Sequence, residues 1–159
     1  MPNTDSLFKI VLLAPEIPGN TGTIGRTCLA LNLELILIRP LGFDLSEKAV
    51  RRAGLDYWKH VKPSEYLSWE EFLEKEQPSQ LFFHSKRAHK TIYEANYSKG
   101  AYLVFGSETK GLPDNLLEMY SEKIFKLPIY SEHVRSLNLA NAATAVAYEA
   151  LRKIKFQNL

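Results

Sequence analysis

The sequence predicts an α/β protein in which helices flank a mainly parallel sheet. Short apolar runs bounded by turn residues recur along the chain, and stretches with helical spacing lie between them. This alternation is typical of parallel sheets, because their strands are joined by helical crossovers. No internal repeat, low-complexity tract or flexible linker interrupts the 159 residues, so we expect residues 1–159 to form a single domain.

Five apolar runs are expected to form the strands, since each is short enough for a buried strand. They span residues 8–14, 35–38, 81–83, 101–105 and 123–127. In such sheets, ligands bind at the carboxyl edge, where the strands end in loops. The loops that follow these runs are therefore the first place to look for a site.

Helix-start signals lie between the runs. Asn20 is expected to be the N-cap of the first helix, and Ser68 with Glu71 forms a capping-box pattern before a second. Pro113 suits the first turn of a third helix. Ser136 is expected to cap the last helix. Behind it, small and apolar residues recur at helical spacing: Ala140, Ala143, Ala147, Ala150, Leu151 and Ile154.

Composition excludes several classes of protein. The chain is 45% hydrophobic and 24% charged, near the average of soluble globular proteins, so a disordered tail is excluded. No apolar run is longer than residues 10–14, whereas a bilayer span needs roughly 20 residues, so no membrane segment is expected. The single cysteine, Cys28, is expected to pack in the core. Because the N-terminus lacks a basic, apolar leader, we expect a cytoplasmic protein.

Cations are concentrated in two clusters, although the formal net charge is only +2. Residues 46–62 contain Lys48, Arg51, Arg52, Lys59 and Lys62. Lys86, Arg87 and Lys90 form the second cluster. Such segregation builds phosphate-binding faces, but solvated helix faces give the same pattern, and the sequence leaves both interpretations open.

Three loops rich in Gly, Asn, Ser or Arg form the candidate site: residues 19–26, 106–111 and 133–138. The first does not match the G-x-G-x-x-G spacing of dinucleotide-binding loops. The second lacks the Lys and the Ser or Thr of a P-loop, because Leu112 and Pro113 follow Gly111. Since glycines let backbone amides approach a ligand, we expect a backbone-lined pocket for a small cofactor. The simpler alternative is turn chemistry alone.

Metal and hydrolase chemistry find no support in the pattern. The four histidines (His60, His84, His89 and His133) lack the i,i+4 spacing and companion carboxylates of helical zinc sites, so no metal is expected. The sequence contains no G-x-S-x-G nucleophile elbow, which argues against a serine hydrolase.

Four segments carry a family resemblance. They are residues 15–26 (PEIPGNTGTIGR), 51–57 (RRAGLDY), 105–113 (FGSETKGLP) and 135–142 (RSLNLANA). In order and spacing they resemble the motifs of SPOUT-superfamily tRNA 2′-O-ribose methyltransferases, most closely the TrmL/YibK group of wobble-nucleotide enzymes. The resemblance implies S-adenosyl-L-methionine as methyl donor, the anticodon stem-loop of tRNA as substrate, a homodimer, and a SPOUT-type fold with a C-terminal trefoil knot.

The resemblance also implies roles for single residues. The cofactor-binding positions are His84, Gly106, Leu127 and Ser136. The candidate catalytic residues are Arg26, Arg135 and Tyr148. Contacts with RNA are expected from Arg51, Arg52, Lys86, Arg87 and Lys110.

Arg26 presents a chemical difficulty, because a guanidinium with a pKa above about 12 is a poor base. We expect it to grip the adjacent phosphate with two hydrogen bonds and to orient the ribose hydroxyl, while that phosphate or water receives the proton. Arg135 is expected to help hold the substrate. Tyr148 suits a core position as well as a catalytic one.

Two departures from the group's pattern leave details of the expected site open. Ser107 stands where the group has Pro, and Ser restricts φ less, which allows a looser loop. The segment of residues 129–134 is slightly longer than is usual in the group, which affects where Arg135 points.

Three rival functions also stay open. They are a 2′-O-methyltransferase acting on another tRNA or rRNA site, a non-catalytic RNA-binding module of the same fold, and a nucleotide-dependent enzyme of Rossmann type.

Overall fold

The computed structural model describes residues 6–46 and 56–157 of the chain. In these residues seven strands form one sheet: β1 (Phe8–Leu13), β2 (Glu34–Ile38), β3 (Ser64–Tyr66), β4 (Leu81–His84), β5 (Lys90–Thr91), β6 (Ala101–Phe105) and β7 (Ile124–Lys126). Their order is β3-β2-β1-β6-β4-β7-β5, and every neighbouring pair is parallel. The predicted α/β class with a mainly parallel sheet is confirmed.

The five predicted strands are present, with slightly different ends. The first stops at Leu13, because Ala14 adopts a left-handed conformation with φ of 54°. The two edge strands, β3 and β5, were not predicted. In β3, Ser64 and Glu65 are exposed, and β5 is only two residues long. Short polar edge strands resist pairing with other chains, and for the same reason no apolar run marks them.

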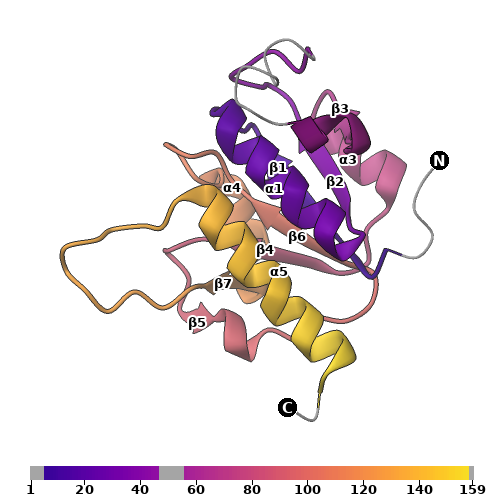
Figure 1. Ribbon diagram of the computed structural model, residues 1–159. Coiled ribbons are helices and arrows are strands. Elements are labelled where there is room, and N and C mark those ends of the chain that lie inside the picture. The colour runs from indigo at the N-terminus through magenta and orange to yellow at the C-terminus, as the bar shows by residue number, and fades with distance from the viewer. Residues whose placement is uncertain (1–5, 47–55, 158–159) are drawn as a thin grey trace.

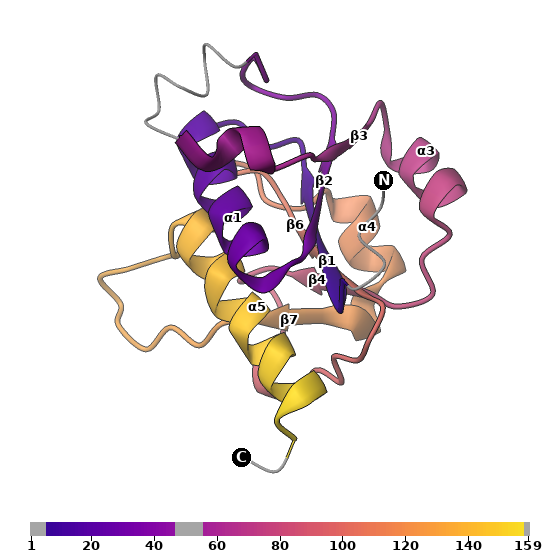
Figure 2. The same cartoon turned by 45° about the vertical axis from the view of Figure 1, so that its right-hand side comes forward.

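Within residues 6–46 and 56–157, four α-helices flank the sheet: α1 (Pro18–Leu31), α3 (Trp69–Glu76), α4 (Asp114–Met119) and α5 (Leu139–Lys155). Three short 3-10 helices, η1 (Asp56–His60), η2 (Ile92–Glu94) and η3 (Ser121–Lys123), lie in the connections. Helices α1 and α5 cover one face of the sheet, and α3 and α4 cover the other (Figures 1 and 2). Within the described residues, no helix is long and apolar enough to cross a membrane.

Strand β1 shows how the core is divided between the two faces. Ile10 and Leu12 pack on the α1 and α5 side, whereas Val11 and Leu13 pack on the α3 and α4 side. Because side chains alternate along a strand, a fully apolar run is what a strand buried on both faces requires. Cys28 lies in the first of these cores, and burial raises the pKa of its thiol to about 12, as expected of an inert core cysteine.

Two of the predicted helix caps are wrong. Helix α1 begins at Pro18, whose fixed φ suits the first helical position, so Asn20 lies inside the first turn. Helix α5 is capped by Asn138 rather than Ser136, because Asn138 Oδ1 accepts from the N–H groups of Ala140 (2.9 Å) and Asn141 (3.2 Å).

The other two helix starts agree with the sequence analysis. The hydroxyl of Ser68 accepts from the Glu71 N–H (3.1 Å), while the Glu71 carboxylate accepts from the N–H of Leu67, one residue before the position that a capping box predicts. Pro113 stands immediately before the first residue of α4. The predicted capping of α3 is therefore confirmed.

Candidate functional site

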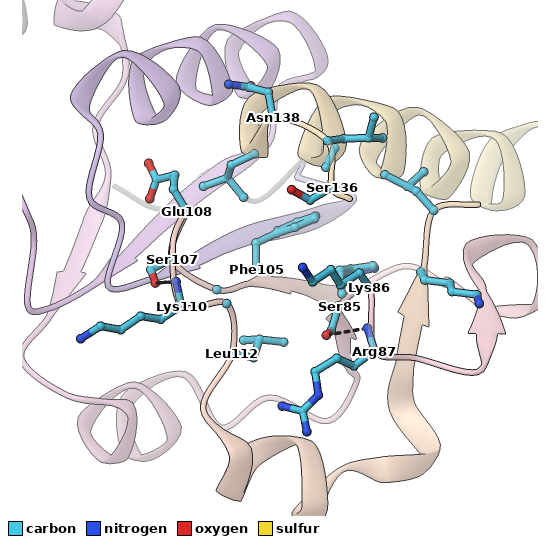
Figure 3. A pocket seen from close by; sticks show the side chains of 18 of the residues that line it. Ser85, Lys86, Arg87, Phe105, Ser107, Glu108, Lys110, Leu112, Ser136 and Asn138 are labelled. Carbon is cyan, nitrogen blue, oxygen red and sulfur yellow. Dashed lines mark hydrogen bonds between the residues drawn. The ribbon is translucent and has the colours of Figure 1, made fainter. Parts of the chain in front are cut away.

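A cavity of about 420 Å³ lies at the carboxyl edge of the sheet, among the segments that follow β1, β4, β6 and β7 (Figure 3). Aromatic and aliphatic side chains line part of it: Phe105, Leu112, Leu117, Phe125 and Val146. Polar residues, among them Ser85, Ser107, Ser136 and Asn138, line another part. An apolar pocket with a few polar groups at this edge of a parallel sheet is the usual form of a small-molecule site.

The structure brings together all four predicted cofactor positions. His84 ends β4, Gly106 follows β6, Leu127 follows β7, and Ser136 precedes α5, and each lines the cavity. We call residues 106–112 the β6 loop and residues 127–138 the β7 loop. The four positions therefore border one pocket, and its walls follow strands that are neighbours in the sheet but distant in the sequence.

The side chain of His84 is engaged by the fold. Its Nδ1 lies 3.1 Å from the carbonyl oxygen of Val104, which can only accept, so Nδ1 carries the proton and Nε2 accepts from the Tyr97 hydroxyl at 2.8 Å. The ring also stacks on Phe105, with centroids 4.6 Å apart. Burial lowers the pKa of the imidazole to about 4. His84 is thus neutral near pH 7 and offers a ligand its backbone rather than a charge.

Gly106 allows the β6 loop to close on itself. A Cβ at this position would lie 2.1 Å from the carbonyl carbon of Gly111 and 2.3 Å from the nitrogen of Leu112. The closed loop is held by the Gly111 N–H, which donates to the Ser107 carbonyl at 2.9 Å. Glycine is therefore required at position 106 by the shape of the loop itself, whether or not a ligand also approaches its backbone.

Ser107 compensates for the absence of a proline ring. Its hydroxyl accepts from the Lys110 N–H at 3.2 Å, so the side chain closes a turn within the β6 loop. The greater backbone freedom of serine is offset by this hydrogen bond, and the loop is not left open.

Glu108 ties the β6 loop to the start of α1. Its carboxylate accepts from the N–H groups of Glu16 and Ile17, both at 2.8 Å, and from the side-chain amide of Asn20 at 3.2 Å. A carboxylate at a helix N-terminus also interacts favourably with the helix dipole. The oxygen of the same Asn20 amide accepts from Asn138 Nδ2 at 3.0 Å, which extends the network to the start of α5.

Glu16 makes the reciprocal connection. Its carboxylate accepts from the N–H (3.0 Å) and the hydroxyl (2.7 Å) of Thr109, and these hydrogen bonds lower the pKa of the Glu16 carboxyl. The sequence analysis did not single out Glu16. Thr109, Asn20 and Asn138 connect one loop to the next, so three of the four segments that carry the family resemblance form one connected structure.

Cations surround the cavity. Lys86, Arg87 and Lys110, three of the predicted RNA contacts, all line it (Figure 3), together with Lys126, which the sequence analysis missed. The signal for Lys126 was its place at the end of a predicted strand. The guanidinium of Arg87 pairs with Asp114 at 2.6 Å, in an exposed ion pair. Arg51 and Arg52 lie outside the described residues.

The three predicted catalytic residues do not line the cavity of this chain. Arg26 is exposed on α1, and its guanidinium lies 5.4 Å from the ring centroid of Tyr57. Arg135 is exposed in the β7 loop, and Tyr148 is half exposed on α5. Helices α1 and α5 pack together, with the hydroxyls of Thr27 and Thr144 2.7 Å apart. Arg26 and Tyr148 therefore belong to the exposed side of this helix pair.

The described residues contain no group of three or more His, Cys, Asp or Glu side chains placed to hold a metal ion. The site is instead assembled from the β6 and β7 loops, aromatic and aliphatic side chains, and cations.

Comparison with known proteins identifies the family of this chain. The model of the SpoU rRNA Methylase family matches residues 7–148. The chain belongs to this family.

Relatives match the whole length of this SpoU-family chain. A homologue from Listeria innocua is 46% identical over 159 residues, covering 98% of this chain and 90% of its own. A homologue from Saccharophagus degradans, named tRNA (cytidine(34)-2'-O)-methyltransferase, is 42% identical over 151 residues, covering 94% of this chain and 97% of its own.

Solved structures share the fold. One, described as giving "Structural insights into the 2-OH methylation of C/U34 on tRNA", has a TM-score of 0.85 and 45% identity, covering 92% of this chain and 95% of its own. An AdoMet-bound rRNA methyltransferase from Sinorhizobium meliloti has a TM-score of 0.79 and 26% identity, covering 95% of this chain and 57% of its own. The predicted resemblance to methyltransferases is confirmed.

Proposed function

We propose that this chain is a tRNA 2′-O-ribose methyltransferase that moves a methyl group from S-adenosyl-L-methionine to the 2′-hydroxyl of nucleotide 34, the wobble position. The observation that carries the proposal is the cavity itself. Four separate segments of the chain line it, and four cations are among the lining residues. The choice of tRNA over rRNA is supported by relatives at 42–45% identity that are named or described for nucleotide 34 of tRNA.

The lining of the cavity fits S-adenosyl-L-methionine. Its volume of about 420 Å³ is in the range of small-molecule sites, and Phe105, Leu112 and Phe125 offer apolar surface to a flat purine ring. Gly106, Leu127 and the backbone of His84 are the residues that we expect to hold it, with Ser136 supplying a hydroxyl. When bound, this cofactor supplies a methyl group attached to a positively charged sulfur. No metal enters the proposal.

The chain's own residues must then orient the ribose. Arg26 is proposed to grip the phosphate next to the target nucleotide through its planar fork of donors and so to fix the 2′-hydroxyl, with that phosphate or water taking the proton. Arg135 is proposed to hold the neighbouring RNA. Positioning of this kind supplies a large part of the rate in group transfer.

The place of Arg26 supports a homodimer. Asn20 lines the cavity, but Arg26 lies six residues further along α1, about 9 Å along the helix axis, and points to solvent. We propose that Arg26 serves the cavity of a second copy, with the exposed side of α1 and α5 forming the contact. On the basis of the family resemblance, we also propose a C-terminal trefoil knot, a single domain and a cytoplasmic location.

Mixed dimers test the shared site. An Arg26→Ala chain and an Arg135→Ala chain are co-expressed with different tags, and the mixed dimer is isolated. If the two arginines of one site come from different subunits, one of its two sites is wholly wild type, and activity recovers toward half of normal. Activity no greater than that of either parent dimer contradicts the arrangement, as does a light-scattering mass of one chain with full activity.

The substrate is tested directly. Purified protein is incubated with unmodified tRNA and methyl-labelled S-adenosyl-L-methionine, and nuclease fragments are analysed by mass spectrometry. We expect one 2′-O-methyl group, at nucleotide 34, and its absence from tRNA of cells lacking the protein. Methylation of rRNA or of another tRNA position overturns the assignment of substrate. RNA binding without methyl transfer favours the non-catalytic module instead.

A further inference from the structure

The most exposed large hydrophobic side chain of the described residues stands beside the cavity. Tyr130, in the β7 loop, leaves 96% of its surface in water. A single exposed apolar residue is ordinary on a protein surface, so exposure alone assigns nothing. The place of Tyr130 is what matters. Its neighbour Ile129 lines the cavity, as do Leu127, Ser136 and Leu137 of the same loop.

The β7 loop extends away from the body of the protein. In Figure 1 it is the long orange segment between β7 and α5, and it projects beyond the sheet and the helices. Every residue from Tyr130 to Asn138 is exposed. A molecule bound over the cavity and too large to enter it would therefore meet this loop.

The charges nearby indicate what such a molecule is. Lys86, Arg87, Lys110 and Lys126 line the cavity beneath the loop, and the loop itself carries Arg135 and one carboxylate, Glu132. A cationic surface next to a free aromatic ring is the combination that binds single-stranded nucleic acid, because phosphates pair with the cations and bases stack on the ring.

We propose that Tyr130 is a positioning residue that stacks on a nucleobase of the RNA, next to the nucleotide whose ribose is methylated. The inference rests on the proposed function, since it takes RNA to be the substrate. Proteins that recognise single-stranded RNA loops commonly splay bases out of the stack and hold them on aromatic side chains. The tyrosine ring replaces the stacking that one of them loses, and it does so for any base, because every base has a flat face.

Four variants separate stacking from other roles. Tyr130→Ala should raise the KM for tRNA by roughly 10-fold, within the range for loss of one base–aromatic stack, and leave kcat and the cofactor Kd unchanged. Tyr130→Phe should behave as wild type, because the ring is kept. Tyr93→Ala, which removes another exposed tyrosine, in η2 and not among the residues that line the cavity, is the control. The salt dependence of binding should not change in any of them, since no charge is lost.

Tyr130→Trp adds a fluorescence signal that should change on RNA binding only if the side chain at position 130 contacts the RNA. Its added fluorescence should be quenched when an anticodon stem-loop RNA is titrated in, beyond any change in the wild type, whose Trp58 and Trp69 pack in or against the core. Wild-type KM in Tyr130→Ala, a Phe variant as impaired as the Ala variant, or no quenching of the introduced indole overturns the proposal. So does a Tyr130→Ala chain that loses its dimer, which would place the ring between two copies.

The outcome is separable from that of the proposed function. If the wild-type protein methylates no RNA, the proposed function fails. If it methylates tRNA but Tyr130→Ala has the wild-type KM, the stacking role alone fails.

Discussion

The β6 loop and the β7 loop border the same cavity but are built in opposite ways. In the β6 loop, Gly106 permits a tight closure, Ser107 holds it from within, and Glu108 and Thr109 fasten it to the segment before α1. In the β7 loop, residues 130–138 are all exposed, and the contact between the His133 N–H and the Ser131 hydroxyl is local (3.1 Å).

This difference matches the two ligands that we propose. A small cofactor of fixed shape binds best to a wall that is already in place, because no ordering cost is incurred on binding. A large RNA must be admitted and released, and exposed loops accommodate that. The comparison predicts that changes in the closed backbone of the β6 loop act on cofactor binding and stability, whereas changes in the exposed cations and in Tyr130 and Arg135 of the β7 loop act on RNA.

The largest effect is expected from Gly106→Ala. Because the new Cβ would overlap the backbone of Gly111 and Leu112, we expect cofactor affinity to fall by more than about 100-fold and the free energy of unfolding to fall by about 3 kcal/mol. Gly19→Ala is the control, since a Cβ there meets nothing within 4 Å. Calorimetric titration and denaturant unfolding measure both quantities. Unchanged affinity in Gly106→Ala would remove the main support for a rigid β6 loop.

Arg26→Ala tests the other side of the comparison. Loss of phosphate positioning should reduce methyl transfer on the order of 100-fold and leave cofactor affinity unchanged, because the proposed partner of Arg26 is the RNA and not the cofactor. Arg26→Lys should restore little, since lysine lacks the planar fork. Single-turnover assays measure the rate. Near-wild-type activity in the alanine variant would refute the assignment.

Glu108→Gln weakens the link between the β6 loop and α1. The amide nitrogen of glutamine cannot accept from the N–H groups of Glu16 and Ile17, and the charge at the helix N-terminus is lost, so we expect about 2 kcal/mol of destabilisation. Glu118→Gln, on the exposed side of α4, should change stability by less than about 0.5 kcal/mol. Equal losses in the two variants would show that the network adds nothing.

The buried imidazole of His84 makes a pH prediction. Its pKa is lowered in the folded protein from 6.5 to about 4, so the unfolded chain takes up a proton first as the pH falls. Stability is then lost between pH 6.5 and 4, by roughly 1 kcal/mol at pH 5.5 from this residue. In His84→Gln this part of the pH dependence should disappear, whereas the exposed His89→Gln should retain it. Urea unfolding at several pH values distinguishes them.

The smallest effect is expected from single exposed cations. Replacing Lys86 or Lys110 by glutamine should flatten the log–log salt dependence of RNA binding by roughly 0.7–0.9 per lost phosphate contact. The cofactor Kd should stay the same. Filter binding at several salt concentrations gives the slope, and a slope equal to the wild type's would make these lysines ordinary surface residues.

Much of the fold could be predicted, because β1, β2 and β6 are apolar runs that a doubly buried strand requires. The short polar strand β5 carries no such signal. Helix caps were harder to predict. Asn20 and Ser136 are both good cap residues, but α1 begins at Pro18 and α5 is capped by Asn138. These choices depend on which backbone N–H groups are left free, which composition does not reveal.

The site was predicted unevenly for the same physical reason. His84, Gly106, Leu127 and Ser136 meet because parallel strands end at one edge. The hydrogen bond between Thr109 and Glu16 joins two loops that touch only in the folded chain, so sequence spacing could not predict it. That Arg26 does not line the cavity of its own chain likewise could not be predicted from the motif that contains it.

Calorimetric titration with S-adenosyl-L-methionine in the presence of EDTA tests the central claim most directly. We predict saturable binding of one cofactor per chain without a metal, and no competition from NAD or ATP. No binding of S-adenosyl-L-methionine at millimolar concentration, with NAD or ATP bound instead, would contradict the account.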